Sequence, residues 1–364
     1  MFIYNEQLAI MYKLSEIKQM KNEDTKIEIL QKAIEKLQKT AKLTIQIQNG
    51  NFHFDTMIRI RINEMELHFA AEVKNIVTPA TLGLVVRQIR NLPQRGLLVT
   101  RYVTPQIAER MKEMDIQFID TAGNAYINEP PLLIFIKGNR ALHKVRKERP
   151  TRPFQPIGLQ VVFALLCNYK EGLEKKPFRY IAQQANAALG TVGLVMRDLR
   201  KMGYLVDMGK RGRRLVRRKE LLDRWVAAYP EQLRPKKLIA NYKAADINWW
   251  KNKDLTAFEA FWGGEVAAAY VTKYLKPTVV TIYAKEPGKL ALTNRLKKDP
   301  NGNVEILKIF WNFQYVGYTP FAEHTDLVHP ILIYADLLAT GDERNIETAE
   351  IIYERELARF IRED

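Results

Sequence analysis

Cysteine and long apolar runs are scarce in this sequence, and each shortage excludes a class of protein. Cys167 is the only cysteine among 364 residues, which rules out an intrachain disulfide and a cysteine-rich zinc site. The longest apolar-rich run, residues 157–167, is far shorter than the roughly 20 residues of a membrane-spanning helix. The first residues lack the charged-then-apolar layout of a secretory signal. We therefore expect a cytoplasmic protein with no membrane partner.

Acidic residues are scarce in one segment of the chain. Residues 137–237 contain 25 lysines and arginines against 8 aspartates and glutamates, whereas the rest of the chain contains 32 against 33. The formal net charge of +16 therefore comes from this one segment. A basic block between near-neutral flanks is typical of a protein that binds a polyanion, most often nucleic acid. The alternative is a solvated basic surface without a partner.

Residues 1–138 have the pattern of an α/β domain. An amphipathic helix is expected over residues 23–43, and two alternating strands over 52–62 and 66–74, joined by a tight turn at 63–66. Together with the elements that follow, they predict a three-layer domain with a mixed sheet between helices. The following elements are helices at 78–91 and 104–115, and strands at 96–103, 116–128 and 132–138.

The predicted hairpin carries a possible nuclease motif. Glu72 and Lys74 flank one apolar residue near the end of the second strand, and a register counted around the turn places Asp55 opposite Lys74 on the same face. Asp55 and Glu72 are candidate ligands of Mg²⁺, which prefers hard oxygen atoms, and Lys74 would complete a catalytic set. The alternative is an ordinary polar face, on which Arg59 and Arg61 compete for the carboxylates and disfavour a metal.

The basic segment itself divides into a linker and a second domain. Residues 139–156 are basic, contain three prolines and lack apolar periodicity, so we read them as a linker. Residues 157–236 predict three helices, a two-stranded hairpin with a basic tip, and a further helix. This is the element order of a winged helix-turn-helix domain. The predicted helices are 157–169, 178–187, 190–203 and 219–229, and the hairpin is 204–219.

The third helix of such a domain lies in the major groove of double-stranded DNA. Val192, Val195 or Met196, and Leu199 form its expected core side, and Arg197 is the best candidate for a base or phosphate contact. Basic residues on the hairpin suit phosphate or minor-groove contacts. The candidate DNA-binding residues are Thr191, Gly193, Arg197, Arg200, Lys201, Lys210, Arg211, Arg213 and Arg214.

Residues 237–364 predict a C-terminal α+β domain. Residues 237–252 read as its connection to the winged helix, and residues 258–275 as a helix. The remaining expected elements are strands at 277–285 and 303–311 and helices at 329–341 and 345–362. The fold class is therefore a multidomain α/β protein with a central winged helix.

Two resemblances add to these patterns. The order of helix, hairpin, helix, strand and helix in residues 1–138 resembles the restriction-endonuclease-like, or PD-(D/E)xK, fold. Three phrases, together with the winged helix, resemble the AbiEi-like family of transcriptional regulators and antitoxins of type IV toxin–antitoxin systems. These phrases are FIDTAGNAYIN (118–128), WGGEVAAAYVTKYLKP (262–277) and HPILIYADLLATGDERNIETAEIIYE (329–354).

The family resemblance implies a bacterial repressor of its own operon, with a nucleotidyltransferase-type toxin encoded nearby. It transfers the residues of the winged helix and no catalytic residue, so no cofactor is expected. Because winged-helix repressors often bind paired half-sites, a homodimer is expected as well. Two hypotheses follow: a DNA-binding regulator of the antitoxin type, or a Mg²⁺-dependent nuclease that the winged helix directs to DNA.

Overall fold

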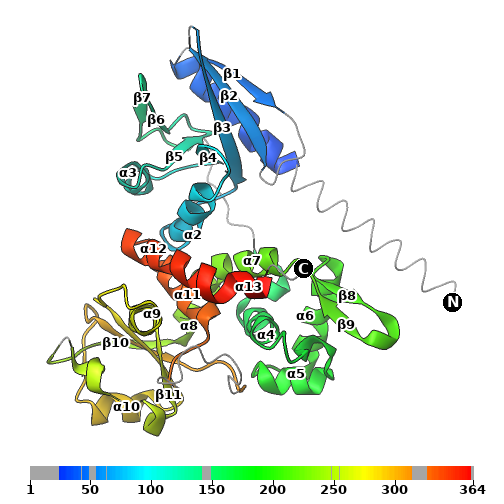
Figure 1. Ribbon diagram of the computed structural model, residues 1–364, viewed down its shortest axis with the longest axis vertical. Helices are drawn as coiled ribbons and strands as arrows, with labels where there is room; N and C mark the ends of the chain where they lie inside the picture. Colours follow the sequence, from blue (N-terminus) through cyan, green and yellow to red (C-terminus); the bar gives the residue numbers. More distant parts are fainter. Residues whose placement is uncertain are drawn as a thin grey trace. The chain divides into compact units, whose positions relative to one another are not determined.

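The chain forms two compact units, residues 1–149 and 150–364, in a computed structural model (Figure 1). The structure describes residues 24–41, 43–48, 55–62, 64–141, 149–246, 248–253, 255–313 and 326–361. Parts of six predicted elements lie outside these ranges: residues 23 and 42, 52–54, 63, 142–148, 247 and 362. Both units combine helices with sheets, which confirms a multidomain α/β protein at that level. Within the described ranges, no helix has both the length and the apolar character needed to cross a bilayer.

The first unit contains a seven-stranded sheet whose strands follow one another in sequence order. Neighbouring strands are antiparallel except for β3–β4 and β4–β5, which are parallel and are connected by the helices α2 and α3. The strands are β1 (Thr44–Gln48), β2 (Thr56–Ile62), β3 (Met65–Lys74), β4 (Gly96–Thr100), β5 (Gln117–Asp120), β6 (Ala125–Glu129) and β7 (Leu132–Ile136). The helices are 24–41, α2 (Pro79–Arg90) and α3 (Pro105–Glu113).

Helices cover both faces of this sheet. The helix at 24–41 buries Ile29, Ala33 and Leu37 against a core that includes Phe69 and Val99. The helices α2 and α3 connect parallel strands by successive crossovers, and crossovers of the same hand place both of them on one face. The core cluster under the helix at 24–41 contains no residue of α2 or α3, so these two helices lie on the other face. The unit therefore has a helix–sheet–helix arrangement.

The register of the β2–β3 hairpin differs from the predicted one. Ile62 is paired with Met65 and Thr56 with Ala71, so only two residues separate the paired strands. The prediction that Asp55 lies opposite Lys74 is therefore wrong, because it reserved four residues for the turn. The shift amounts to two residues, and side chains alternate along a strand, so each strand still presents the predicted side chains to the same face.

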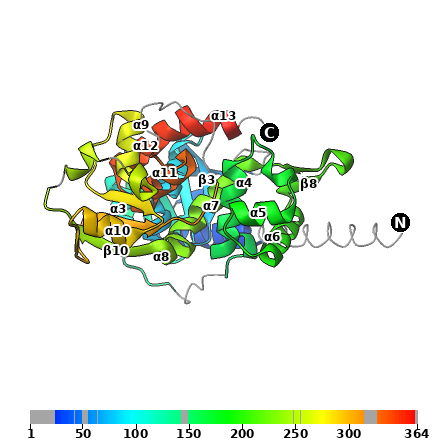
Figure 2. The same cartoon turned by 90° about the horizontal axis from the view of Figure 1, so that it is seen from below.

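The second unit begins with three helices and a small antiparallel sheet (Figure 2). The helices pack around α4, whose residues Leu159 to Leu166 are buried almost throughout. The chain reverses between α5 and α6 at Asn186, whose φ of 49° lies in the left-handed region that asparagine tolerates. The elements are α4 (Pro156–Cys167), α5 (Phe178–Gln184), α6 (Leu189–Lys201), β8 (Leu205–Asp207), β9 (Arg213–Leu215) and α7 (Arg218–Gln232).

A five-stranded sheet in the order β11-β12-β14-β10-β13 forms the rest of this unit, with β12 and β14 parallel. Two predictions are corrected here. Residues 237–252 contain β10, which lies inside the sheet, and the predicted helix at 258–275 begins with the strand β11. The strands are β10 (Leu238–Lys243), β11 (Ala260–Gly263), β12 (Val280–Ala284), β13 (Lys297–Lys298) and β14 (Val304–Lys308). The helices are α8 (Arg234–Lys237), α9 (Gly264–Thr272), α10 (Pro287–Thr293), α11 (Pro330–Thr340), α12 (Glu343–Ile352) and α13 (Ala358–Ile361).

Aromatic side chains join α4 to the C-terminal part of the second unit. The ring of Phe163 lies 5.3 Å from that of Trp225 in α7 and 5.2 Å from that of Phe310. Trp311 and Phe313 contact the same ring at 5.7 and 5.8 Å. Large aromatic side chains bury 150–250 Å² each and dominate the cores that they form. The helices that precede β8 are therefore packed directly against the segment that follows β14.

Candidate nucleic-acid interface

The helix α6 is amphipathic, with a clear division between its two sides. Val192, Val195, Met196 and Leu199 are all buried, which agrees with the predicted core side. Given 3.6 residues per turn, the opposite side is a stripe at positions 190, 194, 197 and 201. Its residues are Gly190, Leu194, Arg197 and Lys201, and all four are exposed.

The turn that presents α6 is held by one buried side chain. The Gln160 amide in α4 donates to the carbonyl oxygens of Ala185 at 3.1 Å and Asn186 at 3.2 Å. The same nitrogen lies 3.3 Å from the carbonyl oxygen of Phe310. Gln160 is only 2% exposed, so these carbonyl groups are satisfied away from water. Sequence reasoning missed this role, although Gln160 is the one polar side chain in the apolar run 157–167 and was the available signal.

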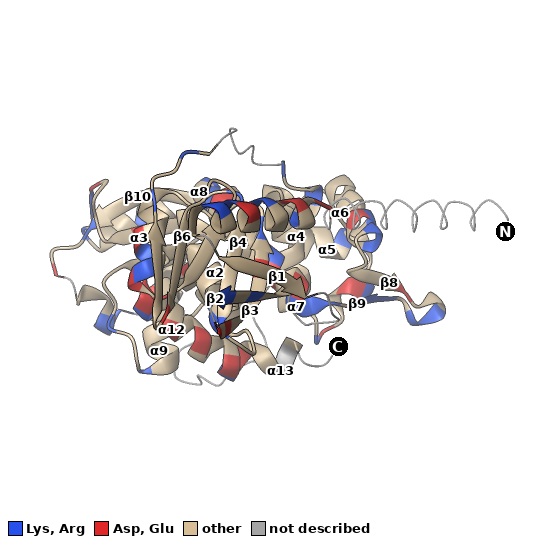
Figure 3. Cartoon of the chain, turned by 90° about the horizontal axis from the view of Figure 1, so that it is seen from above, with Lys and Arg blue, Asp and Glu red and all other residues tan. Residues whose placement is uncertain are grey.

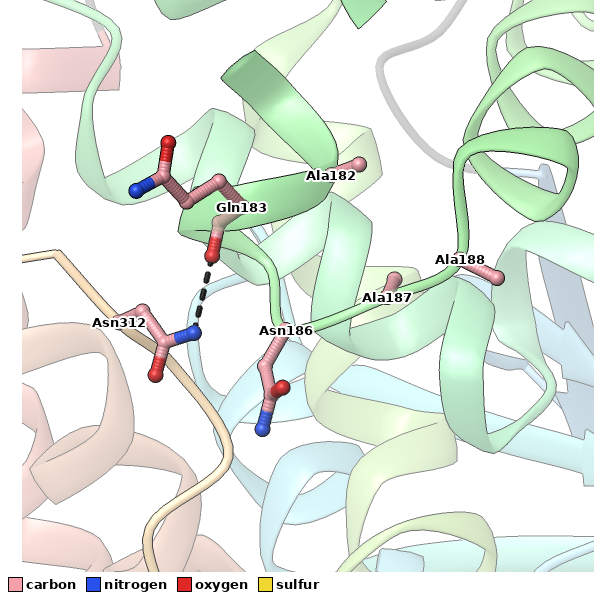
Figure 4. Close-up of a pocket in the computed structure, with 6 residues that line it drawn as sticks. All are labelled: Ala182, Gln183, Asn186, Ala187, Ala188 and Asn312. Atoms are coloured by element: carbon pink, nitrogen blue, oxygen red, sulfur yellow. Dashed lines mark hydrogen bonds between the residues drawn. The ribbon is translucent and has the colours of Figure 1, made fainter. Parts of the chain in front are cut away.

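A shallow pocket of about 380 Å³ lies beside this turn (Figure 4). Asn312 borders it and donates from its side chain to the carbonyl oxygen of Gln183 at 3.1 Å. Gln183 and Asn186 are exposed there, next to the start of α6. The position of α6 thus depends on two segments far away in sequence. The lining residues are Ala182, Gln183, Asn186, Ala187, Ala188 and Asn312.

The β8–β9 hairpin projects from the three helices and carries cations at its tip (Figures 1 and 3). Its pairing places Val206 opposite Arg214 and Asp207 opposite Arg213. Gly209 and Gly212 adopt φ values of 62° and 80°, which glycine reaches without the cost that a side chain adds. The exposed cations of the hairpin are Lys210, Arg211 and Arg214.

Arg213 differs from its neighbour Arg214, since it is bound within the chain. Its guanidinium donates to the carbonyl oxygens of Glu174 at 2.7 Å and Lys176 at 2.6 Å. It also lies 4.6 Å from the centre of the Phe178 ring, and burial lowers the pKa of the guanidinium. Arg213 therefore attaches the hairpin to the start of α5. The sequence contains a signal for this difference between the two arginines. Successive side chains along a strand point to opposite faces, so Arg213 and Arg214 are expected to have different surroundings.

The other residues of α6 that the sequence predicts to bind DNA also differ in whether they have contacts within the chain. Arg200 lies 3.7 Å from Asp207, and Gly193 packs near the Phe178 ring, 3.8 Å from where its Cβ would lie. Thr191 is half-buried at the flank of the outward stripe. Within the part of the chain that the structure describes, five predicted cations have neither an ion-pair nor a hydrogen-bond partner for their side chains. They are Arg197, Lys201, Lys210, Arg211 and Arg214.

In the first unit, the three residues of the possible nuclease motif meet at one end of β3. The Asp55 carboxylate accepts a hydrogen bond of 2.7 Å from the main-chain N–H of Val73, the residue between Glu72 and Lys74. It also forms an ion pair of 2.5 Å with Lys26. Glu72 and Lys74 form an ion pair of 2.7 Å with each other. Each carboxylate thus has its own lysine.

The rest of this face is also internally paired. Glu66 lies 2.5 Å from Arg61 and 3.7 Å from Arg59, and 3.8 Å from His68. The hydrogen bond from Arg61 lowers the pKa of the Glu66 carboxyl group. The predicted competition of the two arginines for carboxylates is therefore directed at Glu66 instead of Glu72.

These contacts do not fit a Mg²⁺ site. Mg²⁺ is held by carboxylate oxygens in near-octahedral geometry, whereas Asp55 and Glu72 are each bound to an ammonium group. Among the described residues, no group of three or more histidine, cysteine, aspartate or glutamate side chains is arranged to hold a metal ion.

One comparison with known proteins gives a match. Residues 214–358 match the family described as transcriptional regulator, AbiEi antitoxin, type IV toxin–antitoxin (TA) system. The matched segment runs from β9 to α13, covers less than half of the chain, and includes two of the three phrases quoted above. No curated protein and no solved structure matches the chain. The match supports a regulator of a toxin–antitoxin system, and it leaves the first unit and helices α4 to α6 unassigned.

Proposed function

We propose that this chain is a DNA-binding transcriptional regulator, an antitoxin-type repressor of its own toxin–antitoxin operon. Double-stranded DNA binds to the second unit, where α4 to β9 act as a winged helix-turn-helix. The observation that carries this proposal is the surface formed by α6 and the hairpin. It combines an outward helical stripe with cations that no carboxylate neutralises within the described residues.

In the proposed complex, α6 enters the major groove with its outward stripe toward the bases. Arg197 and Lys201 lie toward the C-terminal half of that stripe and reach the phosphates or bases. Thr191 and Arg200 flank the stripe and make secondary contacts. Lys210, Arg211 and Arg214 bind the phosphates or the minor groove beside it.

The regulatory part of the proposal rests on the family match. It implies DNA as one partner and a toxin as another, and we propose that the toxin is of the nucleotidyltransferase type and is encoded nearby. We further propose that the chain binds as a homodimer, because winged-helix repressors often bind two half-sites related by symmetry.

The test measures binding of the full chain to duplex DNA from its own promoter region over a range of salt concentrations. Because cations release counterions from the phosphates, log affinity is expected to fall linearly with log salt. A charge-reversal variant is expected to abolish binding at physiological salt and to lower the salt slope by about three. This variant is Lys210→Glu, Arg211→Glu, Arg214→Glu.

A matched control has the same change in net charge on β10 and β13 of the same unit. It is Lys243→Glu, Lys297→Glu, Lys298→Glu, and all three lysines are exposed. The control is expected to keep the wild-type salt slope. Equal losses in both variants would show that net charge alone governs binding, and unchanged binding in the hairpin variant would overturn the proposed interface.

The nuclease hypothesis receives less support from the same molecule. Asp55, Glu72 and Lys74 do lie at one end of β3, but the two carboxylates are paired with lysines. We propose instead that this end of the first unit is a neutral surface left by a nuclease-like ancestor.

A further inference from the structure

The start of α6 has an unusual composition for a helix that reads DNA. Residues 189–196, its first two turns, contain no charged side chain and no side-chain amide. Thr191 is the single residue there with a side-chain O–H or N–H group. In the major groove, guanine is recognised mainly by arginine or lysine and adenine by asparagine or glutamine. The first two turns of α6 offer neither kind of contact.

What these turns do offer is exposed apolar surface. Leu194 is 38% exposed and lies on the outward stripe between Gly190 and Arg197. At Gly190 an added Cβ would meet no described atom within 4 Å, so nothing in the described part of the chain covers the stripe at that point. A single exposed leucine is ordinary on a protein surface. Here it lies on the same helix face as two cations without an ion-pair partner in the described residues, Arg197 and Lys201.

The position of Leu194 also suits a base contact. In helix-turn-helix proteins the N-terminal residues of the recognition helix contact the base edges. Thymine is the one DNA base with a methyl group in the major groove, and apolar side chains recognise it by contact. Because Gly190 has no side chain, the helix can approach the floor of the groove one turn before Leu194.

We propose that Leu194 is a specificity-determining residue that contacts the 5-methyl group of thymine. Arg197 and Lys201, further along the same stripe, hold the helix in the groove. The favoured sites then contain thymine at the position facing Leu194. This inference rests on the proposed function, since it requires α6 to lie in the major groove.

The test begins by selecting tight-binding duplexes from a random pool with the full chain. Each thymine of the selected site is then replaced by deoxyuridine, which lacks only the methyl group. At one position, replacement is expected to weaken binding about fourfold, the effect of removing one methyl group from an apolar contact. In the Leu194→Ala variant, the same replacement is expected to have no effect.

A control variant separates this contact from general effects of losing a leucine. Leu292 in α10 is 82% exposed and lies outside the proposed interface, so Leu292→Ala is expected to keep the wild-type sensitivity to deoxyuridine. Equal sensitivity in Leu194→Ala and wild type would overturn the inference while leaving DNA binding intact. Binding that no thymine replacement weakens would overturn it as well. Failure to bind any duplex would overturn the proposed function, and the inference with it.

Discussion

Two surfaces of this protein carry many charges, and they differ in how those charges are used. On the β2–β3 face of the first unit, Glu66 is surrounded by Arg59, Arg61 and His68, and Glu72 is paired with Lys74. On α6 and the hairpin of the second unit, five cations have neither an ion-pair nor a hydrogen-bond partner for their side chains in the described part of the chain. The first surface has largely neutralised itself, and the second has its charge available for a polyanion.

This difference shows why charge counts alone locate a binding surface only coarsely. Exposed ion pairs contribute little to stability, about 0–1 kcal/mol each, but they remove cations from the set that can release counterions from DNA. Even within the basic segment, Arg200 and Arg213 are engaged inside the chain. The relevant quantity is the number of cations left without a partner.

Apart from the charge reversal of the hairpin, the largest effect is expected from a change that leaves every charge in place. Gly190→Leu puts a large side chain on the outward stripe, where no atom of the described residues lies within 4 Å of an added Cβ. DNA affinity is expected to fall about ten- to a hundredfold, because the added bulk displaces base contacts worth about 1–3 kcal/mol. Thermal stability is expected to stay the same or rise, since glycine is a poor helix former. Both are measured on the purified chain, by fluorescence anisotropy and thermal unfolding.

Gly288→Leu is the matched control, since Gly288 is also the second residue of a helix, α10, and an added Cβ there would also have no described atom within 4 Å. It is expected to leave DNA affinity unchanged. If Gly190→Leu bound as tightly as wild type, binding would depend on charge alone and α6 would lie outside the groove.

Smaller effects are expected from substituting two neighbouring arginines of β9, of which one has partners inside the chain and the other has none in the described residues. Arg213→Ala removes two hydrogen bonds and the contact with the Phe178 ring, and is expected to lower the free energy of unfolding by about 1–3 kcal/mol. Arg214→Ala is expected to leave stability within about 0.5 kcal/mol and to lower the salt slope of DNA binding by about one. Chemical denaturation and salt titration measure the two effects. The distinction would fail if both variants lost stability equally.

The smallest effect is expected on the first unit. Glu72→Ala and Lys74→Ala are expected to change DNA affinity less than about twofold, because each breaks a pair outside the proposed interface. A plasmid-nicking assay with Mg²⁺ and Mn²⁺ is expected to give no cleavage by the wild-type chain. If the wild-type chain cleaved the plasmid and neither variant did, the first unit would be an active nuclease. The paired charges of that unit would then matter more for function than the unpaired cations of the second.

Much of the fold could be predicted from hydrophobic periodicity. The helices α2, α4, α6 and α11 lie within two residues of their predicted ends, because their apolar spacing is regular and proline or glycine marks their limits. The strands β1 and β10 were missed because both are short, β1 is mostly polar, and apolar and polar residues do not alternate strictly in β10. Only Ile45 is buried in β1 and only Tyr242 in β10. Their pairing partners, which lie elsewhere in the sequence, make them strands.

The candidate interface was predictable in its location but not in its details. Alternation and helical spacing identify the outward stripe of α6 and the exposed cations of the hairpin. They do not reveal that Arg213 binds the carbonyl oxygens of Glu174 and Lys176, because those contacts join residues almost forty positions apart. The prediction that Asp55 lies opposite Lys74 was wrong for a related reason. The length of a turn follows from the pairing of both strands, which one strand's sequence does not determine.

The amide of Gln160 has a consequence for taking this protein apart. It joins the turn before α6 to the backbone of Phe310, and the ring of Phe163 beside it is covered by residues from both halves of the second unit. A fragment that ended at residue 236 would keep α4 to α7, but it would expose the ring of Phe163, which is buried in the whole chain. The helices that we propose to read DNA and the segment that matches the antitoxin family therefore share one core, and we expect neither part to fold when it is expressed without the other.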